Sequence, residues 1–197
     1  MTNLFISLFI KLFFLLTPFF VLSVFLSMTE HMTKAEQRRV AARTTLSVTI
    51  ISLVLYFAGN PIFSTLGITL DGFRIGAGSL LFLSSVSLVG GNRSSHDVAP
   101  DVDFAVVPLA IPITVGPAAI GTLLILGAEL GGATERIVGA AALVCSCLCV
   151  GILLRSSRVL KKALGSVGLS IMTKITGLIL SAMAAQIVFT GVKSFLD

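Results

Sequence analysis

The chain has 197 residues, of which 55% are hydrophobic and only 12% are charged, and its mean hydropathy is +1.05. Because about a quarter of the residues in a soluble domain are charged, this composition excludes a water-soluble globule. Six charge-free runs of 18 or more residues fill most of the chain: 12–29, 44–70, 75–92, 104–128, 137–154 and 175–192. About 20 apolar residues cross a bilayer as a helix, whereas a membrane β-barrel needs alternating segments of about ten residues, a pattern absent from this sequence. We therefore expect an all-α polytopic membrane protein, a bundle of six transmembrane helices that forms one domain over residues 1–197.

The basic residues indicate how this bundle is oriented. Nine of them fall in the gaps between runs 1 and 2, 3 and 4, and 5 and 6: Lys34, Arg38, Arg39, Arg43, Arg93, Arg155, Arg158, Lys161 and Lys162. The opposite side receives only Arg136 and Lys193. By the positive-inside rule, the three basic loops face the cytoplasm and both termini lie outside. These short juxtamembrane clusters require no nucleic-acid partner to explain them.

The two halves of the sequence resemble each other. Similar residues recur about 100 positions apart in three pairs: Pro18 and Pro117, Gly67-Ile68-Thr69 and Gly168-Leu169-Ser170, and Arg74 and Lys174. We expect two three-helix repeats, at 5–92 and 104–194, and an odd number of spans inserts the second repeat upside down. Inverted repeats are typical of transporters, with the binding site at the repeat interface. A chance likeness between apolar segments that contain glycine and proline is the alternative.

The fourth run predicts a broken helix. It contains three prolines and two glycines within a short distance: Pro108, Pro112, Gly116, Pro117 and Gly121. An interior proline removes a helical hydrogen bond and clashes with the preceding turn, so the chain is expected to be non-helical or sharply kinked from Thr114 to Pro117. A half-helix that begins near Pro117 would direct its positive end at an anionic group, with Thr114 and Thr122 adding hydroxyl contacts. A proline-kinked packing helix without a ligand is the alternative.

The first run carries a single proline, in Leu16-Thr17-Pro18-Phe19-Phe20. Because bulky residues follow it, a kink at Thr17 is expected rather than an open loop. The candidate substrate-binding residues of the two runs together are Thr17, Pro18, Phe20, Thr114, Gly116, Pro117 and Thr122.

Arg74 and Lys174 occupy similar places near the starts of the third and sixth spans, and Asp71 precedes Arg74 by one helical turn. We assign these three residues to a gating or coupling role, with snorkelling anchors as the alternative. Catalysis is not expected, because the spans hold no Ser/His/Asp, His/Glu or acidic cluster. No phosphate-binding loop is present, and no metal or other cofactor is expected.

The stretch from Val107 to Thr122, Val-Pro-Leu-Ala-Ile-Pro with a short spacer and Gly-Pro-x-x-Ile, resembles the signature of the MarC family of inner-membrane proteins. The segments Gly67 to Ile75 and Lys174 to Gly177 also fit, and the likeness extends from the first span to the C-terminus. It implies six spans in the inner membrane with both termini outside. Some members of the family are described as transporters of small neutral amino acids.

This sequence departs from the family pattern in its first span. The family usually has Asn or Asp before the proline and Gly two residues after it, where this chain has Thr17 and Phe20. The first half of the site is therefore expected to be apolar and narrow. The leading hypothesis is a secondary transporter or exporter of small polar metabolites, with neutral amino acids as the favoured substrates. A non-transporting membrane protein that stabilises or recruits a partner is the alternative, and the sequence carries no signal for an oligomeric state.

Overall fold

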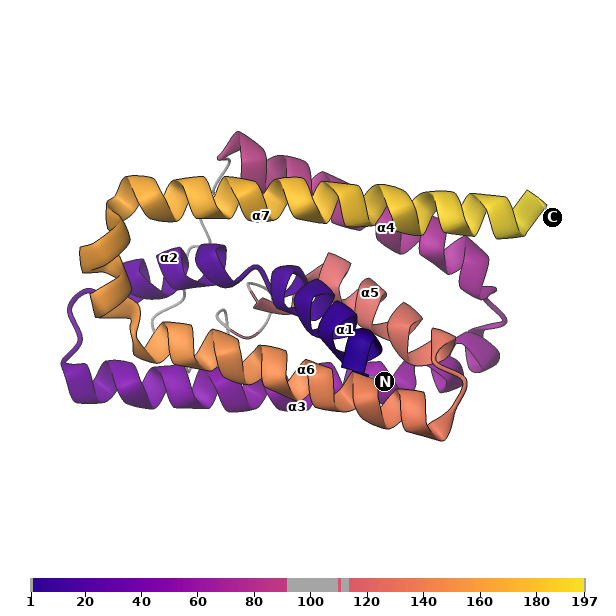
Figure 1. Cartoon of the computed structure of the whole chain (residues 1–197), viewed down its shortest axis with the longest axis horizontal. Helices are drawn as coiled ribbons and strands as arrows, with labels where there is room; N and C mark the ends of the chain where they lie inside the picture. Colours follow the sequence, from indigo (N-terminus) through magenta and orange to yellow (C-terminus); the bar gives the residue numbers. More distant parts are fainter. Residues whose placement is uncertain (1, 92–109, 111–113, 197) are drawn as a thin grey trace.

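The computed structural model describes residues 2–91, 110 and 114–196, and helices dominate these ranges. In chain order the helices are α1 (Thr2–Leu15), α2 (Pro18–Met28), α3 (Lys34–Leu66), α4 (Leu70–Gly90), α5 (Pro117–Glu129), α6 (Ala133–Arg155) and α7 (Ser157–Leu196). The long helices α3, α6 and α7 run along the long axis of the molecule, and both chain ends lie in the right-hand half of Figure 1. The expected all-α architecture is confirmed.

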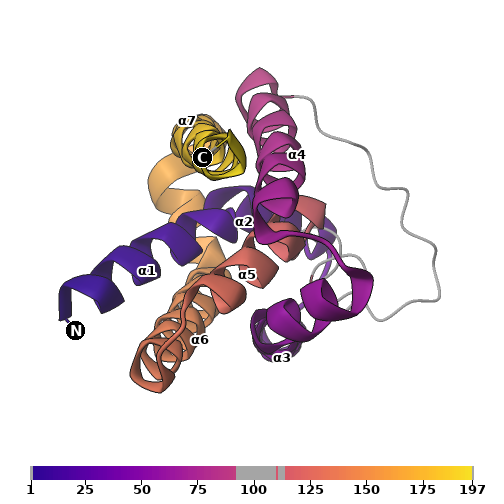
Figure 2. The ribbon, with the colours of Figure 1, turned by 90° about the vertical axis from the view of Figure 1, so that its right-hand side faces the viewer.

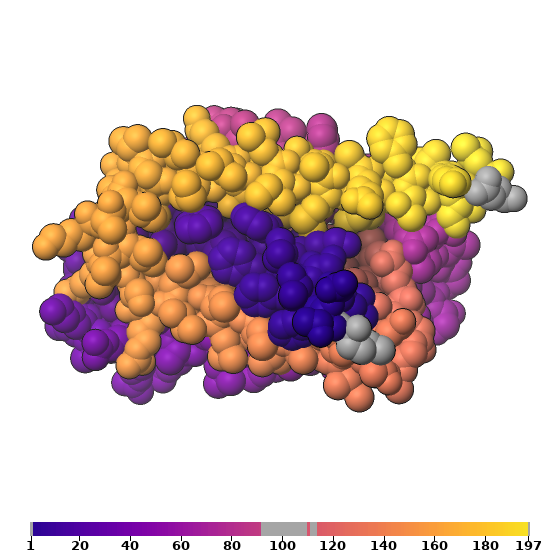
Figure 3. All heavy atoms as spheres, in the orientation of Figure 1, coloured from indigo at the N-terminus to yellow at the C-terminus, as the bar shows by residue number. Residues whose placement is uncertain are grey.

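The helices form two pairs with two shorter helices between them. Viewed end-on in Figure 2, α4 and α7 lie together on one side and α3 and α6 on the other, and α2 and α5 fill the space between the pairs. Helix α5 packs against α3 and α4, whereas α2 packs mainly against α7. Helix α1 packs along α6 and covers part of the face seen in Figure 3.

Length and composition make this bundle a multi-pass membrane protein. Five helical stretches of the described residues are long and apolar enough to cross a membrane, with α1 and α2 together counted as one of them. The fourth expected run, 104–128, is described mainly through α5, an apolar helix of 13 residues. Large apolar side chains cover the outer faces of the long helices, where lipid can solvate them: Leu46, Ile50, Val54 and Phe57 on α3, Leu148 and Ile152 on α6, and Leu178 and Phe189 on α7.

The first span is broken more completely than the expected kink. Helix α1 ends at Leu15 and α2 begins at Pro18. Between them Thr17 adopts a left-handed conformation with φ 46° and ψ 54°, a region that β-branched residues rarely enter. Because Pro18 has no N–H to donate and the left-handed residue Thr17 interrupts the right-handed helix, the chain starts a second helix instead of bending.

Two segments expected to be basic loops are helical. Helix α3 begins at Lys34, where Thr33 and Glu36 form a reciprocal capping box. Helix α7 begins at Ser157, directly after α6, and turns at Gly165, whose φ of 64° and ψ of −178° suit only glycine. Charge ends a hydrophobic run but does not end a helix, so these helices continue beyond the apolar segments that hydropathy marks.

Glycines allow the helices to approach closely. A Cβ placed on Gly78 of α4 would lie 3.2 Å from the carbonyl oxygen of Ala184, and one on Gly177 of α7 would lie 3.0 Å from that of Ser85. Between α3 and α5, a Cβ on Gly127 would overlap the carbonyl group of Tyr56. Small residues at such contacts let backbones meet where lipid gives no hydrophobic drive for association.

Candidate functional site

Helix α5 starts at the position expected from the sequence. Gly116 is the N-cap of α5 and Pro117 its first residue, and the N–H of Ile120 donates to the carbonyl of Gly116 over 2.9 Å. Immediately before the break, the N–H of Val115 donates to the carbonyl of Ala110, five residues earlier, over 2.9 Å. Such a wide turn is an interruption often found at functional positions in helices. Pro108 and Pro112 lie outside the described residues.

Helix α2 begins in the same way. Thr17 is its N-cap and Pro18 its first residue, and the N–H of Val21 donates to the carbonyl of Thr17 over 3.0 Å. Each of these positions lies 99 residues before its counterpart in α5. Both α2 and α5 therefore start at a proline in the middle of the bundle (Figure 1).

The two helix starts leave backbone donors available. The first N–H groups of a helix have no partner within it, and among the described residues neither Thr17 nor Gly116 supplies a side-chain cap. In α5 these donors belong to Ala118 and Ala119, which are 6% and 5% exposed. Helices α2 and α5 run toward opposite ends of the bundle (Figure 1), so their positive ends are both directed toward its middle.

The candidate binding residues lie around these two starts with different exposure. Pro18, Thr114 and Thr122 are buried, Thr17, Phe20 and Gly116 are half-buried, and Pro117 is exposed. The Thr122 hydroxyl donates to the carbonyl of Ala118 over 2.9 Å. Its proton is therefore used within α5, and only its lone pairs remain for a ligand.

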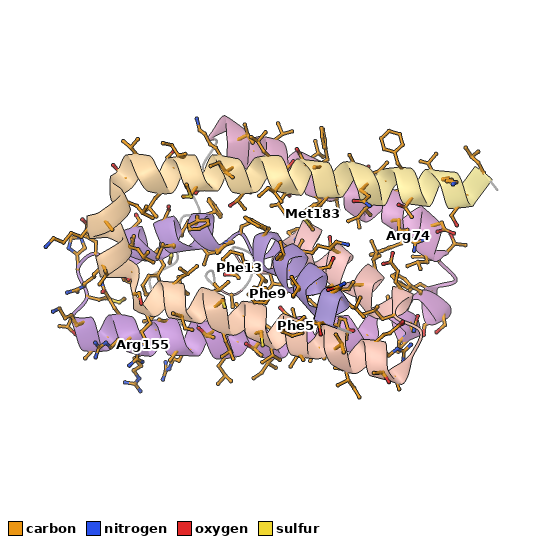
Figure 4. All side chains as sticks on the ribbon, viewed as in Figure 1. Phe5, Phe9, Phe13, Arg74, Arg155 and Met183 are labelled. Atoms are coloured by element: carbon orange, nitrogen blue, oxygen red, sulfur yellow. The ribbon has the colours of Figure 1, made fainter. Side chains whose placement is uncertain are left out.

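The expected Asp71–Arg74 pair is present at one end of the bundle (Figure 4), within a larger cluster. Arg74 Nη1 donates to Asp71 Oδ1, while Arg74 Nε and Nη2 donate to Glu129 Oε1 over 3.0 and 2.7 Å. Ser194 Oγ of α7 donates to Asp71 Oδ2 over 3.0 Å. This cluster of Asp71, Arg74, Glu129 and Ser194, which we call the Arg74 cluster, joins α4, α5 and α7.

Lys174 lies away from the Arg74 cluster. It is exposed and lies 17 residues after the start of α7, because that helix begins far before the apolar run. A Cβ on Gly191 of α7 would contact Arg74, whereas one on Gly177 would contact Val89, so α7 runs antiparallel to α4. Lys174 therefore lies at the level of the other end of α4 and is not brought to the Arg74 cluster.

Three polar residues of the bundle were not singled out from the sequence: Glu129, which is exposed, and the buried Thr44 and Ser52. Glu129 is 55 residues from Arg74, so no local spacing signals their contact. The hydroxyls of Thr44 and Ser52 on α3 are buried and lack a hydrogen-bond partner among the described residues. Serine and threonine barely change the mean hydropathy of a span. The only sequence signal for Thr44 and Ser52 is their spacing of eight residues, which places both on one helix face.

No group of three or more His, Cys, Asp or Glu side chains within residues 2–91, 110 and 114–196 is arranged to hold a metal ion.

Comparison with known proteins identifies the family. The model of the MarC family of integral membrane proteins matches residues 2–196. The chain is 31% identical to the UPF0056 membrane protein YhcE of Escherichia coli over 193 residues, 94% of this chain and 90% of that protein. It is 32% identical to the UPF0056 membrane protein MJ1677 of Methanocaldococcus jannaschii over 199 residues, 98% of this chain and 97% of that protein. No solved structure matches the chain. With its polytopic helical fold and a family match over nearly its whole length, the chain belongs to the MarC family of integral membrane proteins.

Proposed function

We propose that this protein is a secondary transporter or exporter of small polar metabolites, with neutral amino acids as the favoured substrates. The observation that carries the proposal is the pair of helix starts at Pro18 and Pro117, both uncapped by side chains among the described residues. Half-helices that begin inside a membrane bundle and direct their N-termini at an anionic group are a feature of transporters. The carboxylate of an amino acid fits such donors, and the hydroxyl of Thr17 is available to its ammonium group.

The two halves of the chain are proposed to be inverted repeats, at 5–92 and 104–194. The helix contacts support this. An exchange of the two halves swaps α2 with α5, α3 with α6 and α4 with α7. It turns the α2–α7 contact into the α5–α4 contact, which is also present, and it leaves the α3–α6 and α4–α7 contacts unchanged. The glycine contacts support it in register. Gly78 contacts Ala184, and Gly177 contacts Ser85. Gly177 lies 99 residues after Gly78, and Ala184 lies 99 residues after Ser85. The two contacts are therefore the same contact with the halves exchanged.

The proposed orientation in the inner membrane has both termini outside and the basic ends of α3, α6 and α7 in the cytoplasm. Arg155 and Arg74 lie at opposite ends of the bundle in Figure 4, and the chain termini are in the half that holds Arg74. Membrane-impermeant thiol labelling of intact cells tests this: a cysteine at Lys193 is expected to react and one at Arg38 is not. The reverse pattern would refute the orientation.

The proposed site is asymmetric. The second half supplies Gly116, Pro117 and buried backbone donors, and the first half supplies Thr17 and Pro18 beside the bulky Phe20. Phe20 therefore restricts the site to small ligands. Phe20→Gly is expected to widen the range of accepted substrates or raise flux.

Uptake and efflux of a panel of labelled amino acids by liposomes that contain the pure protein test the function directly. Gly116→Leu is expected to lower flux strongly while the protein stays folded, because its side chain would fill the space at the start of α5. Gly76→Leu is the matched control, since Gly76 is exposed and a Cβ there has no atom within 4 Å. Full flux by a folded Gly116→Leu protein would show that the start of α5 has no role in transport and serves only helix packing. No flux by the parent across the whole panel would favour a non-transporting role.

A further inference from the structure

The short helix α5 is held at its C-terminal end by an ionic contact. Its last residue is Glu129, and a carboxylate at a helix C-terminus is unfavourable next to the negative end of the helix dipole. Arg74 of α4 compensates through Nε and Nη2, which donate to Glu129 Oε1 over 3.0 and 2.7 Å. Asp71 holds the same guanidinium and itself accepts from Ser194 of α7. The C-terminal end of α5 is thus fixed directly on α4, and α4 is linked in turn to α7.

Helix α2 has a weaker version of the same contact. Glu30 lies just beyond the end of α2 and 99 residues before Glu129, the spacing that also separates Pro18 from Pro117. Its carboxylate is 3.8 Å from Lys161 Nζ. The side chains of Glu30 and Lys161 are 61% and 54% exposed, whereas those of Arg74 and Glu129 are 15% and 36% exposed.

The difference in exposure and geometry decides which contact is the stronger. Exposed pairs at a distance near 4 Å contribute little, because water and salt screen them. A guanidinium that directs two N–H groups at a carboxylate and is largely removed from water is held more tightly. Of the two ion pairs, the one in the Arg74 cluster is therefore the firm contact and the Glu30–Lys161 pair the loose one.

We propose that Glu129 and Arg74 form a latch that positions α5 and closes the bundle at the end where the Arg74 cluster lies, and that its release is the conformational step that opens this end. The inference deepens the proposed function, because α5 carries the helix start at Pro117 on which that function rests. Release would free the C-terminal end of α5 from α4. The glycine contact of α5 with α3 then becomes the pivot that remains, since Gly127 meets the backbone of Tyr56.

A thiol-accessibility experiment tests the latch independently of transport. The background replaces Cys145, Cys147 and Cys149 by alanine and carries one reporter cysteine at Ala77. Ala77 is 4% exposed, and its Cβ would be 2.6 Å from a Cβ on Gly121, so α5 covers it. In proteoliposomes, Glu129→Gln is expected to raise the rate of labelling by a hydrophilic thiol reagent about tenfold, the effect of losing one charge-assisted contact.

Glu30→Gln is the matched control, and it should leave the labelling rate at Ala77 unchanged. The double variant R74E/E129R restores opposite charges and should return labelling toward the parent rate. Size-exclusion chromatography verifies that each variant is folded. A folded Glu129→Gln protein with the parent labelling rate would overturn the latch, as would equal effects of Glu30→Gln and Glu129→Gln. If labelling behaves as expected while no amino acid is transported, the latch stands and the proposed substrate fails.

Discussion

The half-helices α2 and α5 start alike but are held by different means. Helix α5 contains Gly121 and Gly127, which bring its backbone against α4 and α3. Helix α2 contains no glycine and packs through large side chains, with Phe25 and Leu22 fully buried. The ion pairs follow the same division, since α5 ends in the Arg74 cluster and α2 is followed by the loose Glu30–Lys161 pair.

The comparison separates two ways of positioning a short helix inside a membrane protein. Contacts of backbone against backbone tolerate no added atom and fix one geometry. Large flexible side chains allow neighbouring arrangements of similar energy. While the latch is closed, we therefore regard α5 as the rigidly placed half of the proposed site and α2 as the adjustable half, and four substitutions test that view.

The largest effect is expected from Gly127→Ala. The new methyl group would overlap the carbonyl group of Tyr56, and overpacking of this kind costs about 3 kcal/mol of unfolding free energy. Gly131→Ala is the control, because a Cβ at Gly131 has no atom within 4 Å. Thermal unfolding in detergent measures both, and similar midpoints for the two variants would show that α5 is not rigidly packed.

A smaller loss is expected from Arg74→Gln, because Asp71 and Glu129 then share one site without a cation. Removing one partner of a partly buried charge cluster is expected to cost about 2 kcal/mol. The same change at the other end, Lys161→Gln, removes an exposed contact and should cost less than about 0.5 kcal/mol. Equal losses in denaturant titrations would contradict the ranking of the two ends.

Gln37→Leu tests the hydrogen bonds that hold the C-terminal end of α2. Gln37 Nε2 donates to the carbonyl of Thr29, just beyond the end of α2, over 2.6 Å, and its Oε1 accepts from Arg158 Nε over 2.7 Å. Loss of both hydrogen bonds at this buried position is expected to cost about 1.5 kcal/mol. Gln186→Leu, on an exposed face of α7, provides the comparison and should be nearly neutral. Equal stability of the two leucine variants would mean that α2 does not depend on Gln37.

The smallest effect is a gain, from Thr17→Gly. Relief of the left-handed strain at Thr17 is expected to raise the unfolding free energy by about 0.5 to 1 kcal/mol. The same replacement at Thr33, an N-cap with an extended backbone and a bonded hydroxyl, should lower the unfolding free energy by about 0.3 kcal/mol. Thermal midpoints that move in the same direction for both variants would argue against strain at Thr17.

Hydropathy and the prolines predicted the membrane class and the places where the spans break. Pro18 and Pro117 each begin a helix, because the missing N–H and fixed φ of proline act on the local backbone whatever surrounds it. The spacing of Asp71 and Arg74 also predicted their contact, since one helical turn is a local geometry. The functional roles of these residues remain predictions.

Features that depend on distant parts of the chain were not predictable. The contact of Arg74 with Glu129 arises only when α5 packs on α4. The complete break at Thr17 was not predicted, because a single proline indicates only a kink. The left-handed conformation of Thr17 depends on the packing around it. The early starts of α3 and α7 were missed because charged residues end a run of hydropathy while remaining good helix formers.

The length of α4 couples the latch to the thickness of the membrane. Its 21 residues rise about 31 Å, nearly equal to the hydrocarbon core of a bilayer, whereas the 33 residues of α3 rise about 50 Å. Helix α3 can absorb hydrophobic mismatch by tilting, but α4 has no excess length to offer. A thicker bilayer would draw Arg74, the fifth residue of α4, toward the acyl chains, where separation from Glu129 is costlier. Lipids with longer chains would thereby keep this end of the protein closed, and lipids with shorter chains would ease its opening.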